Sequence, residues 1–169
     1  MIFENVELHN VVEAEKISGI PGVVLRRYPR ALRHKLNTRG RFVSGLSAGC
    51  EVRLVTEAPY VRAIFFNLEG EGEVYVYSGD FLHGVHKIPP GGFRPIQIDW
   101  PAKFDGTKPE ALKRNFSPRC WRFVANRGEV AFVGIETYGF DYRPPNAEEK
   151  PAKRWLAYGS PIPHSHCHP

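Results

Sequence analysis

The stretch that decides the fold is CEVRLVTEAPYVRAIFFNLEGEGEVYVY, residues 50–77. Apolar and polar side chains alternate at its start, where Val52 and Leu54 point to one side and Glu51 and Arg53 point to the other. Strict alternation is typical of a β-strand with one buried face. The stretch therefore predicts three strands, over residues 50–57, 60–66 and 73–77.

Glycine-containing links join these strands and others like them. The links Glu69–Gly72 (EGEG) and Asn126–Gly128 (NRG) each separate two such runs, and links of this kind are typical of β-hairpins. In the strand over residues 60–66 the polar Arg62 has apolar neighbours. We therefore expect that strand to be buried on nearly both faces.

Further strands are predicted on both sides of this stretch, and helices are few. The strands fall at residues 23–25, 81–88, 96–98, 120–125 and 129–136. Pro29 suits the first position of a short helix that Asn37 can end, and a second short helix is predicted over residues 108–115. About eight or nine short strands with little helix predict an all-β fold, an antiparallel β-sandwich of the jelly-roll kind with one or two short helices.

The composition changes after the predicted sandwich domain, residues 1–140. Residues 141–152, DYRPPNAEEKPA, are polar and proline-rich, which is typical of a linker. The following RWLAYGSPI, residues 154–162, indicates a buried strand that feeds a turn. That strand either begins an α/β domain or closes the sandwich as an edge strand. The linker favours the first alternative, so residues 153–169 are interpreted as the truncated start of a further domain plus a His-rich tail.

Composition restricts the class of protein. The 169 residues are 42% hydrophobic, enough for a core, and no apolar run approaches the roughly 20 residues that span a membrane. The N-terminus, MIFENVELHN, does not resemble a signal peptide. Without an export signal, Cys50, Cys120 and Cys167 are interpreted as free thiols in a reducing cytoplasm, the first two as small core residues. We expect a cytoplasmic protein with no membrane partner.

The formal net charge of +5 raises nucleic acid as a partner, but the pattern of basic residues argues against it. Basic residues alternate with apolar ones along strands, as at Arg62 and Arg122, or form pairs such as Arg26-Arg27, and no run of five occurs. We expect a solvated basic face and no nucleic-acid groove.

Histidine and cysteine residues suggest one metal site, in the C-terminal tail. The tail carries four donors suited to zinc or nickel, namely His164, His166, Cys167 and His168. Because no second cluster completes a structural site, we expect adventitious zinc or nickel binding and no physiological cofactor. His83 and His86 are three apart on a predicted strand, so they should face opposite sides and form no ligand pair.

Asp99 and Trp100, in a predicted loop before Pro101, are the candidate ligand-binding residues. An exposed indole can stack on a sugar ring, and jelly-roll domains include lectins. Trp121 and Phe123, by contrast, share one strand face and are assigned to the core. A stand-alone carbohydrate-binding module is therefore one alternative function.

Four stretches together resemble a known family. They are YPRAL (Tyr28–Leu32), SAGCEVRLVT (Ser47–Thr56), GEVYVY (Gly72–Tyr77) and WLAYGS (Trp155–Ser160). They resemble the N-terminal jelly-roll domain of two-domain SGNH (GDSL-type) esterases, over nearly all of residues 20–162. The resemblance implies a non-catalytic module that packs on a hydrolase domain and helps to shape its substrate entrance. The parent activity that it implies is hydrolysis or transfer of acyl esters through a serine.

The sequence departs from this family at the nucleophile turn, which in the family is Gly-Asp-Ser or Gly-Ser-Ser. Gly159 and Ser160 match the first two positions, so the nucleophile falls at Pro161, which has no hydroxyl. The oxyanion donors and the Asp–His pair of the family are expected in a downstream domain. The isolated chain should therefore be inactive. A residual ester hydrolase using Ser160 with His164 or His166 is the other alternative.

The partner that the resemblance implies is the missing SGNH catalytic domain. Without it an interface would be exposed, and exposed apolar interfaces and strand edges favour association. We therefore expect the isolated chain to form a homo-oligomer, with the segment Trp155–Tyr158 as the adhesive strand.

Overall fold

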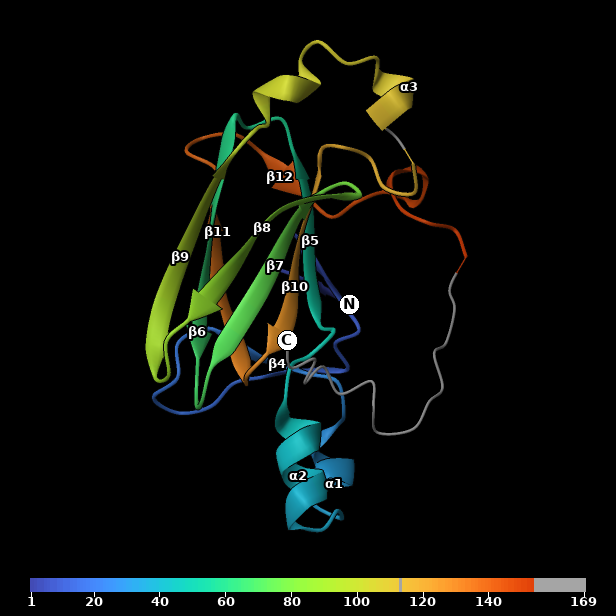
Figure 1. Ribbon diagram of the computed structural model, residues 1–169. Coiled ribbons are helices and arrows are strands. Elements are labelled where there is room, and N and C mark those ends of the chain that lie inside the picture. Colours follow the sequence, from blue (N-terminus) through green and yellow to red (C-terminus); the bar gives the residue numbers. More distant parts are fainter. Residues whose placement is uncertain (113, 154–169) are drawn as a thin grey trace, which may run out of the picture.

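The computed structural model describes residues 1–112 and 114–153. Two antiparallel β-sheets pack face to face, and short helices lie at both ends of the sandwich (Figure 1). The predicted all-β sandwich with short helices is confirmed. Within the described residues, no helix has the length and apolar character needed to cross a bilayer.

The larger sheet has the strand order β1-β2-β5-β10-β7-β8, and β12 pairs with β5 beside this path. Its strands are β1 (Ile2–Phe3), β2 (Val6–His9), β5 (Glu51–Thr56), β7 (Gly72–Ser78), β8 (Phe81–Ile88), β10 (Cys120–Arg127) and β12 (Tyr142–Arg143). The strand β5, at the start of the sequence 50–77, lies between β2 and β10, so both of its edges are paired.

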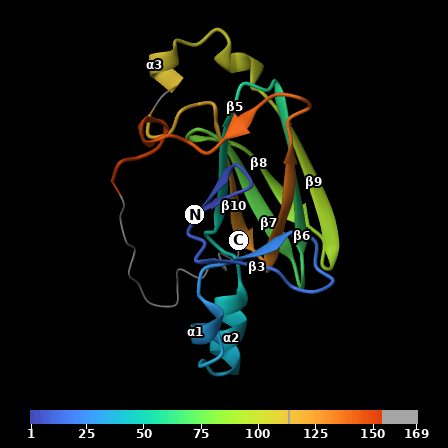
Figure 2. The same cartoon turned by 180° about the vertical axis from the view of Figure 1, so that it is seen from behind.

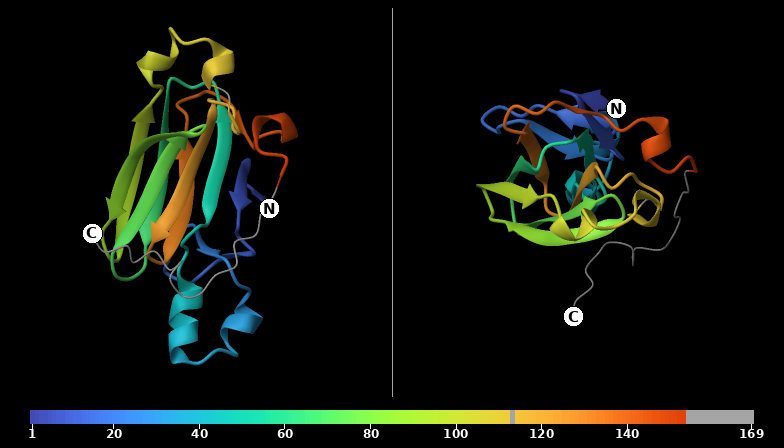
Figure 3. Two further views of the ribbon diagram at one scale, coloured as in Figure 1. Left: turned by 45° about the vertical axis from the view of Figure 1, so that its right-hand side comes forward. Right: turned by 90° about the horizontal axis from the view of Figure 1, so that it is seen from above.

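The smaller sheet has the order β3-β4-β11-β6-β9. Its strands are β3 (Glu13–Glu15), β4 (Val23–Arg26), β6 (Tyr60–Asn67), β9 (Gly92–Asp99) and β11 (Val130–Glu136). Seen from behind, β6 and β9 lie on one side of the molecule and the N-terminal segment on the other (Figure 2). From above, the strands of the two sheets surround a common interior (Figure 3).

Both predicted hairpins are wrong, because each link crosses from one sheet to the other. β6 pairs with β9 and β11 in the smaller sheet, whereas β7 pairs with β8 and β10 in the larger one. β10 and β11 are likewise in different sheets. The glycines of the links, Gly70 and Gly128, do adopt the left-handed backbone that the turns require. Turn residues therefore fix a reversal of the chain, but not the sheet to which the next strand belongs.

The core lies between the sheets and is built from alternate residues of each strand. Trp121 and Phe123 are buried in it, as predicted. At its centre the Phe65 ring lies 5.8 Å from the ring of Phe123 and 5.9 Å from that of Phe132. Cys50 also lies in this core, whereas Cys120 is buried in a separate small cluster with Val55 and Phe116. Burial raises the pKa of each thiol to about 12. Both thiols are therefore neutral small core residues, as predicted.

Short helices lie at opposite ends of the sandwich (Figure 1). α1 (Arg30–Arg33) and α2 (Thr38–Gly45) are at one end, η1 (Ala102–Phe104) and α3 (Pro109–Leu112) at the other, and η2 (Ala147–Glu149) follows β12. The helix predicted from Pro29 to Asn37 is the shorter α1, and α2, which follows Asn37, was not predicted. Asn37 accepts a hydrogen bond from the backbone N–H of Gly40 at 2.8 Å, so it begins α2 and does not end the first helix.

Two of the basic residues assigned to a solvated face are instead ion-paired inside the molecule. Arg26 is only 3% exposed. Its Nε lies 2.6 Å from a carboxylate oxygen of Glu15, and its Nη2 lies 2.5 Å from one of Glu129. The prediction failed for Arg26 and Arg122 because their acidic partners lie far away in the sequence.

Arg122 belongs to a second buried network, which is centred on Glu51. The Glu51 carboxylate accepts from Arg122 at 2.5 Å and from Arg53 at 2.7 Å. Burial acts to raise the pKa of Glu51, but the hydrogen bond from Arg53 and the charge of Arg122 outweigh it and lower that pKa. Glu51 is therefore a buried carboxylate shared by two guanidinium groups.

The proline-rich segment 141–152 is attached to the sandwich over much of its length. Tyr142 and Arg143 form β12 on the edge of β5, and the backbone carbonyl of Glu149 accepts from the N–H of Ser117 at 2.9 Å. Lys150 then reaches Glu7 at 2.6 Å. The segment thus continues the fold as far as Lys150.

Candidate functional site

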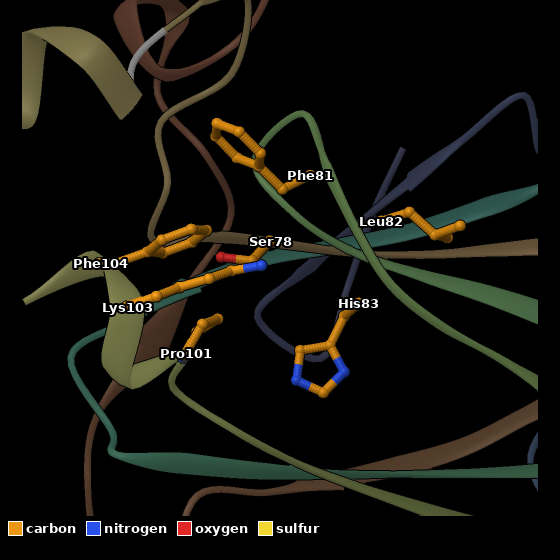
Figure 4. A pocket seen from close by; sticks show the side chains of 7 residues that line it. All are labelled: Ser78, Phe81, Leu82, His83, Pro101, Lys103 and Phe104. Carbon is orange, nitrogen blue, oxygen red and sulfur yellow. The ribbon is translucent and has the colours of Figure 1, made fainter. Parts of the chain in front are cut away.

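A pocket opens at the end of the sandwich that carries η1 (Figure 4). Its volume is about 160 Å³, and its lining residues are Ser78, Phe81, Leu82, His83, Pro101, Lys103 and Phe104. Four of these come from the end of β7 and the start of β8, and three from η1 and the proline before it. The pocket thus lies where the open edge of the larger sheet meets the segment that follows β9.

A β-bulge in β8 brings His83 to this pocket. Leu82 and Gly84 pair with consecutive residues of β7, which leaves His83 as an extra residue between them. The His83 ring contacts the ring of the core residue Trp121 edge-on, with 5.9 Å between centroids. The bulge therefore places the imidazole on the side of the sheet that carries Trp121, although His83 itself stays exposed.

His83 and His86 lie on the same side of the sheet, so the prediction that they face opposite sides is wrong. His86 pairs with the core residue Val74, and a Cβ added to Gly84 would lie 3.3 Å from the Nε2 of His86. The extra residue in the bulge shifts the alternation by one position. Burial lowers the pKa of His86, and the positive charge of Arg94 adds to the effect. Among the described residues no group of three metal-binding side chains occurs.

Positive charge gathers around the pocket. Lys103 lines it, and the Arg114 guanidinium lies 5.7 Å from the centroid of the Phe81 ring, which also lines it. The nearby carboxylate of Asp80 accepts hydrogen bonds from the backbone N–H groups of Asn115 and Phe116, at 2.7 and 2.9 Å. Within the described residues neither Lys103 nor Arg114 forms a salt bridge. In the described part of the chain the pocket therefore offers two cations that form no salt bridge.

The predicted ligand residue Trp100 supports this pocket from behind. Its ring packs against Phe104 at 5.3 Å, and the Arg119 guanidinium covers it at 3.7 Å from the ring centroid. Its indole N–H donates to Asp105 at 2.8 Å. Trp100 is therefore engaged in packing and is not a free stacking surface.

The other predicted ligand residue, Asp99, lies on the outer side of the smaller sheet, at the edge of an aromatic surface. Its register partner Tyr60 forms an edge-to-face pair with Tyr138, with centroids 4.7 Å apart. The Tyr138 backbone has a φ of 55°, which is costly for a residue with a side chain. Beside this pair Arg62 donates to Gln97 at 3.0 Å. Asp99 thus borders two tyrosines and a hydrogen-bonding pair.

The sequence pattern did not predict this outer surface. The prediction that residues 60–66 are buried on nearly both faces is wrong, since alternate side chains of β6 are at least partly exposed: Tyr60, Arg62, Ile64 and Phe66. The alternation was hidden because Ile64 and Phe66 are apolar and yet point outward. Strict counting by two from Tyr60 would have found it.

The remaining predicted site residues lie outside the described part of the chain. They are Ser160, Pro161, His164, His166, Cys167 and His168. The structure therefore tests neither the nucleophile position nor the metal-binding tail.

The fold is similar to parts of two solved structures. One is SsfX3, a salicylyl-acyltransferase from a tetracycline biosynthetic pathway, with a TM-score of 0.61 and 10% identity over 84% of this chain. The other is a GDSL-like lipase from Bacteroides ovatus ATCC 8483, with a TM-score of 0.49 and 11% identity over 84% of this chain. No protein-family model matches the sequence, and neither does any curated protein.

These likenesses concern only part of each neighbour. The chain spans 40% of the length of SsfX3 and 41% of that of the GDSL-like lipase. At 10% identity the likeness to SsfX3 concerns the fold alone, an all-β sandwich that also occurs as one part of a larger acyltransferase.

Proposed function

We propose that this chain is the non-catalytic β-sandwich module of an SGNH (GDSL-type) acyl-ester hydrolase or acyltransferase. The observation that carries the proposal is the likeness to SsfX3, a named acyltransferase in which a sandwich of this fold makes up 40% of the chain. The WLAYGS motif, Trp155–Ser160, supports the same class from the sequence. In such an enzyme the module packs on the catalytic domain and shapes the entrance to the active site.

The chain on its own is expected to have no esterase activity. Pro161 occupies the nucleophile position, and a serine nucleophile needs a base and an orienting group within reach. We expect the purified chain to release p-nitrophenol from p-nitrophenyl acetate no faster than a buffer that contains free histidine at the same total concentration. Turnover that Ser160→Ala removes, and that the control Ser165→Ala retains, would show instead that Ser160 is a nucleophile.

The proposal that the chain belongs to an SGNH enzyme is tested by the DNA that follows the codon for Pro169. We expect it to encode an SGNH catalytic domain, either in frame or after a frameshift. Expression of the joined reading frame should then give serine-dependent hydrolysis of short acyl esters. Downstream DNA that encodes no such domain in any frame would count against the proposal.

A second candidate function is glycan binding at the outer surface around Tyr60 and Tyr138. The observation that favours it is the exposed tyrosine pair beside Arg62, Gln97 and Asp99, because a sugar needs an apolar ring face and fixed polar groups.

A glycan array with the purified chain tests this second function. We expect at least one saccharide to bind, and Tyr138→Ala to weaken its affinity by at least about tenfold. Phe140→Ala is the matched control, because it removes another exposed aromatic ring of the same turn without touching the polar pair. An array without hits, or an equal loss in both variants, would exclude this function for the outer surface.

A further inference from the structure

We infer that the pocket beside η1 binds a small organic carboxylate with an apolar body, of which benzoate is a simple example. The inference rests on the size, walls and charge of the pocket. It does not depend on the proposed function, because it would hold for the sandwich as an isolated module.

The size and the walls of the pocket determine which apolar group of a ligand it can hold. A cavity of about 150 Å³ is known to accept benzene, and this one measures about 160 Å³. Its walls include the rings of Phe81 and Phe104, whose centroids lie 5.1 Å apart at an angle of 58°. Pro101 and Leu82 add further apolar surface. A single aromatic ring or a short acyl chain fits these dimensions.

The charge around the pocket defines the polar end of the ligand. Lys103 lines the pocket, and its ammonium lies 5.8 Å from the centroid of the Phe104 ring, so it is held beside the apolar wall. Arg114 adds a second cation behind Phe81. Within the described residues neither has a carboxylate partner. An anion that enters the pocket can therefore form a charge-assisted hydrogen bond with Lys103 without displacing a carboxylate from it.

The hydrogen bonds already formed direct the carboxylate to one side. Ser78 donates its hydroxyl proton to the carbonyl of Pro118 at 2.7 Å, so it can accept a hydrogen bond but not donate one to an anion. The donors that remain in the lining are Lys103 and the imidazole of His83. The carboxylate should therefore lie at Lys103 and His83, with the apolar body against the wall that the contacting rings of Phe81 and Phe104 form together (Figure 4).

A core side chain provides a reporter for binding. The Trp121 ring contacts that of His83, and its indole N–H is buried without a partner among the described residues. A ligand that contacts His83 should shift the indole resonance of Trp121 in a nitrogen-15 NMR spectrum. The resonance is assigned by its disappearance from the spectrum of Trp121→Phe.

The test is a titration of the labelled full chain with three probes. Benzoate should shift the Trp121 resonance saturably. Benzamide, which has the ring without the charge, and acetate, which has the charge without the ring, should both bind at least about tenfold more weakly. The absence of a saturable shift with benzoate, or equal binding of benzamide, would overturn the inference.

Two charge variants locate the site. Lys103→Met should weaken benzoate binding by at least about tenfold with an unchanged melting temperature, since Lys103 is exposed. Lys87→Met removes the same charge from the far end of β8, where it lines a different cavity, and should leave the affinity unchanged. Equal losses in both variants would mean that net charge alone attracts benzoate, and the site would be rejected.

Discussion

Glu51→Gln is expected to lower the free energy of unfolding by about 3–5 kcal/mol. The side chain of Glu51 is 6% exposed and accepts hydrogen bonds from both Arg53 and Arg122. A neutral amide leaves two guanidinium groups in a largely buried site without their shared carboxylate, although Glu7 still lies 3.5 Å from Arg53. Urea unfolding followed by tryptophan fluorescence measures the change.

The control for this variant is Glu136→Gln, which breaks an exposed salt bridge to Arg62. Exposed pairs contribute about 1 kcal/mol or less, so the control should change stability little. A loss in Glu51→Gln no larger than in the control would mean that the buried network contributes nothing.

The same network predicts the direction of the pH dependence. The folded-state pKa of Glu51 is lowered from its ordinary value of 4.5, so its stabilisation is present above that pH and is lost as the pH falls through the folded-state pKa. The wild-type chain should therefore lose stability on acidification more steeply than Glu51→Gln. Glu15, whose pKa is also lowered, keeps a smaller dependence of the same sign in the variant. A variant with an unchanged acid slope would contradict this assignment.

Phe65→Ala is expected to cost about 3–5 kcal/mol of stability. Phe65 is 1% exposed and packs against rings from both sheets, Phe123 and Phe132. Its removal leaves a cavity at the centre of the sandwich that neither sheet can fill without moving its backbone. Thermal or urea unfolding measures the loss.

The matched control is the next residue of β6. Phe66 points outward and pairs with the exposed Phe93 at 5.1 Å. Phe66→Ala removes the same number of atoms from a partly exposed position, so we expect a loss of less than about 2 kcal/mol. Equal losses at the two positions would contradict the inward and outward alternation on which the sandwich is built.

The buried network also bears on the proposed function. Lys150, Glu7, Arg53 and Glu51 form a continuous series of ion pairs from the proline-rich segment to the centre of the larger sheet. The bidentate pair between Arg143 and Glu149 orders the same segment. In the proposed enzyme these contacts would fix where the chain leaves the sandwich, and hence where the catalytic domain begins.

Periodicity alone predicted much of the fold. Alternation identified the strands from β5 to β11, and it placed Trp121 and Phe123 in the core. It succeeds because the apolar face of a strand is buried whichever strand pairs with it. The burial of Cys50 followed from the same pattern, whereas Cys120 is buried on the other face of β10, in a cluster with Phe116. The candidate site was predicted only in part: Asp99 and Trp100 border the two surfaces but line neither the pocket nor a free stacking face.

The tertiary structure decided what depends on distant partners. Whether EGEG joins two strands of one sheet or crosses to the other depends on which strands far along the chain pair with β6 and β7. The burial of Arg26 and Arg122 depends on Glu129 and Glu51, and the position of His83 depends on a one-residue mismatch with β7. Local sequence determines which face of a strand is apolar, but register, sheet and ion-pair partner are set by contacts that only the folded chain brings together.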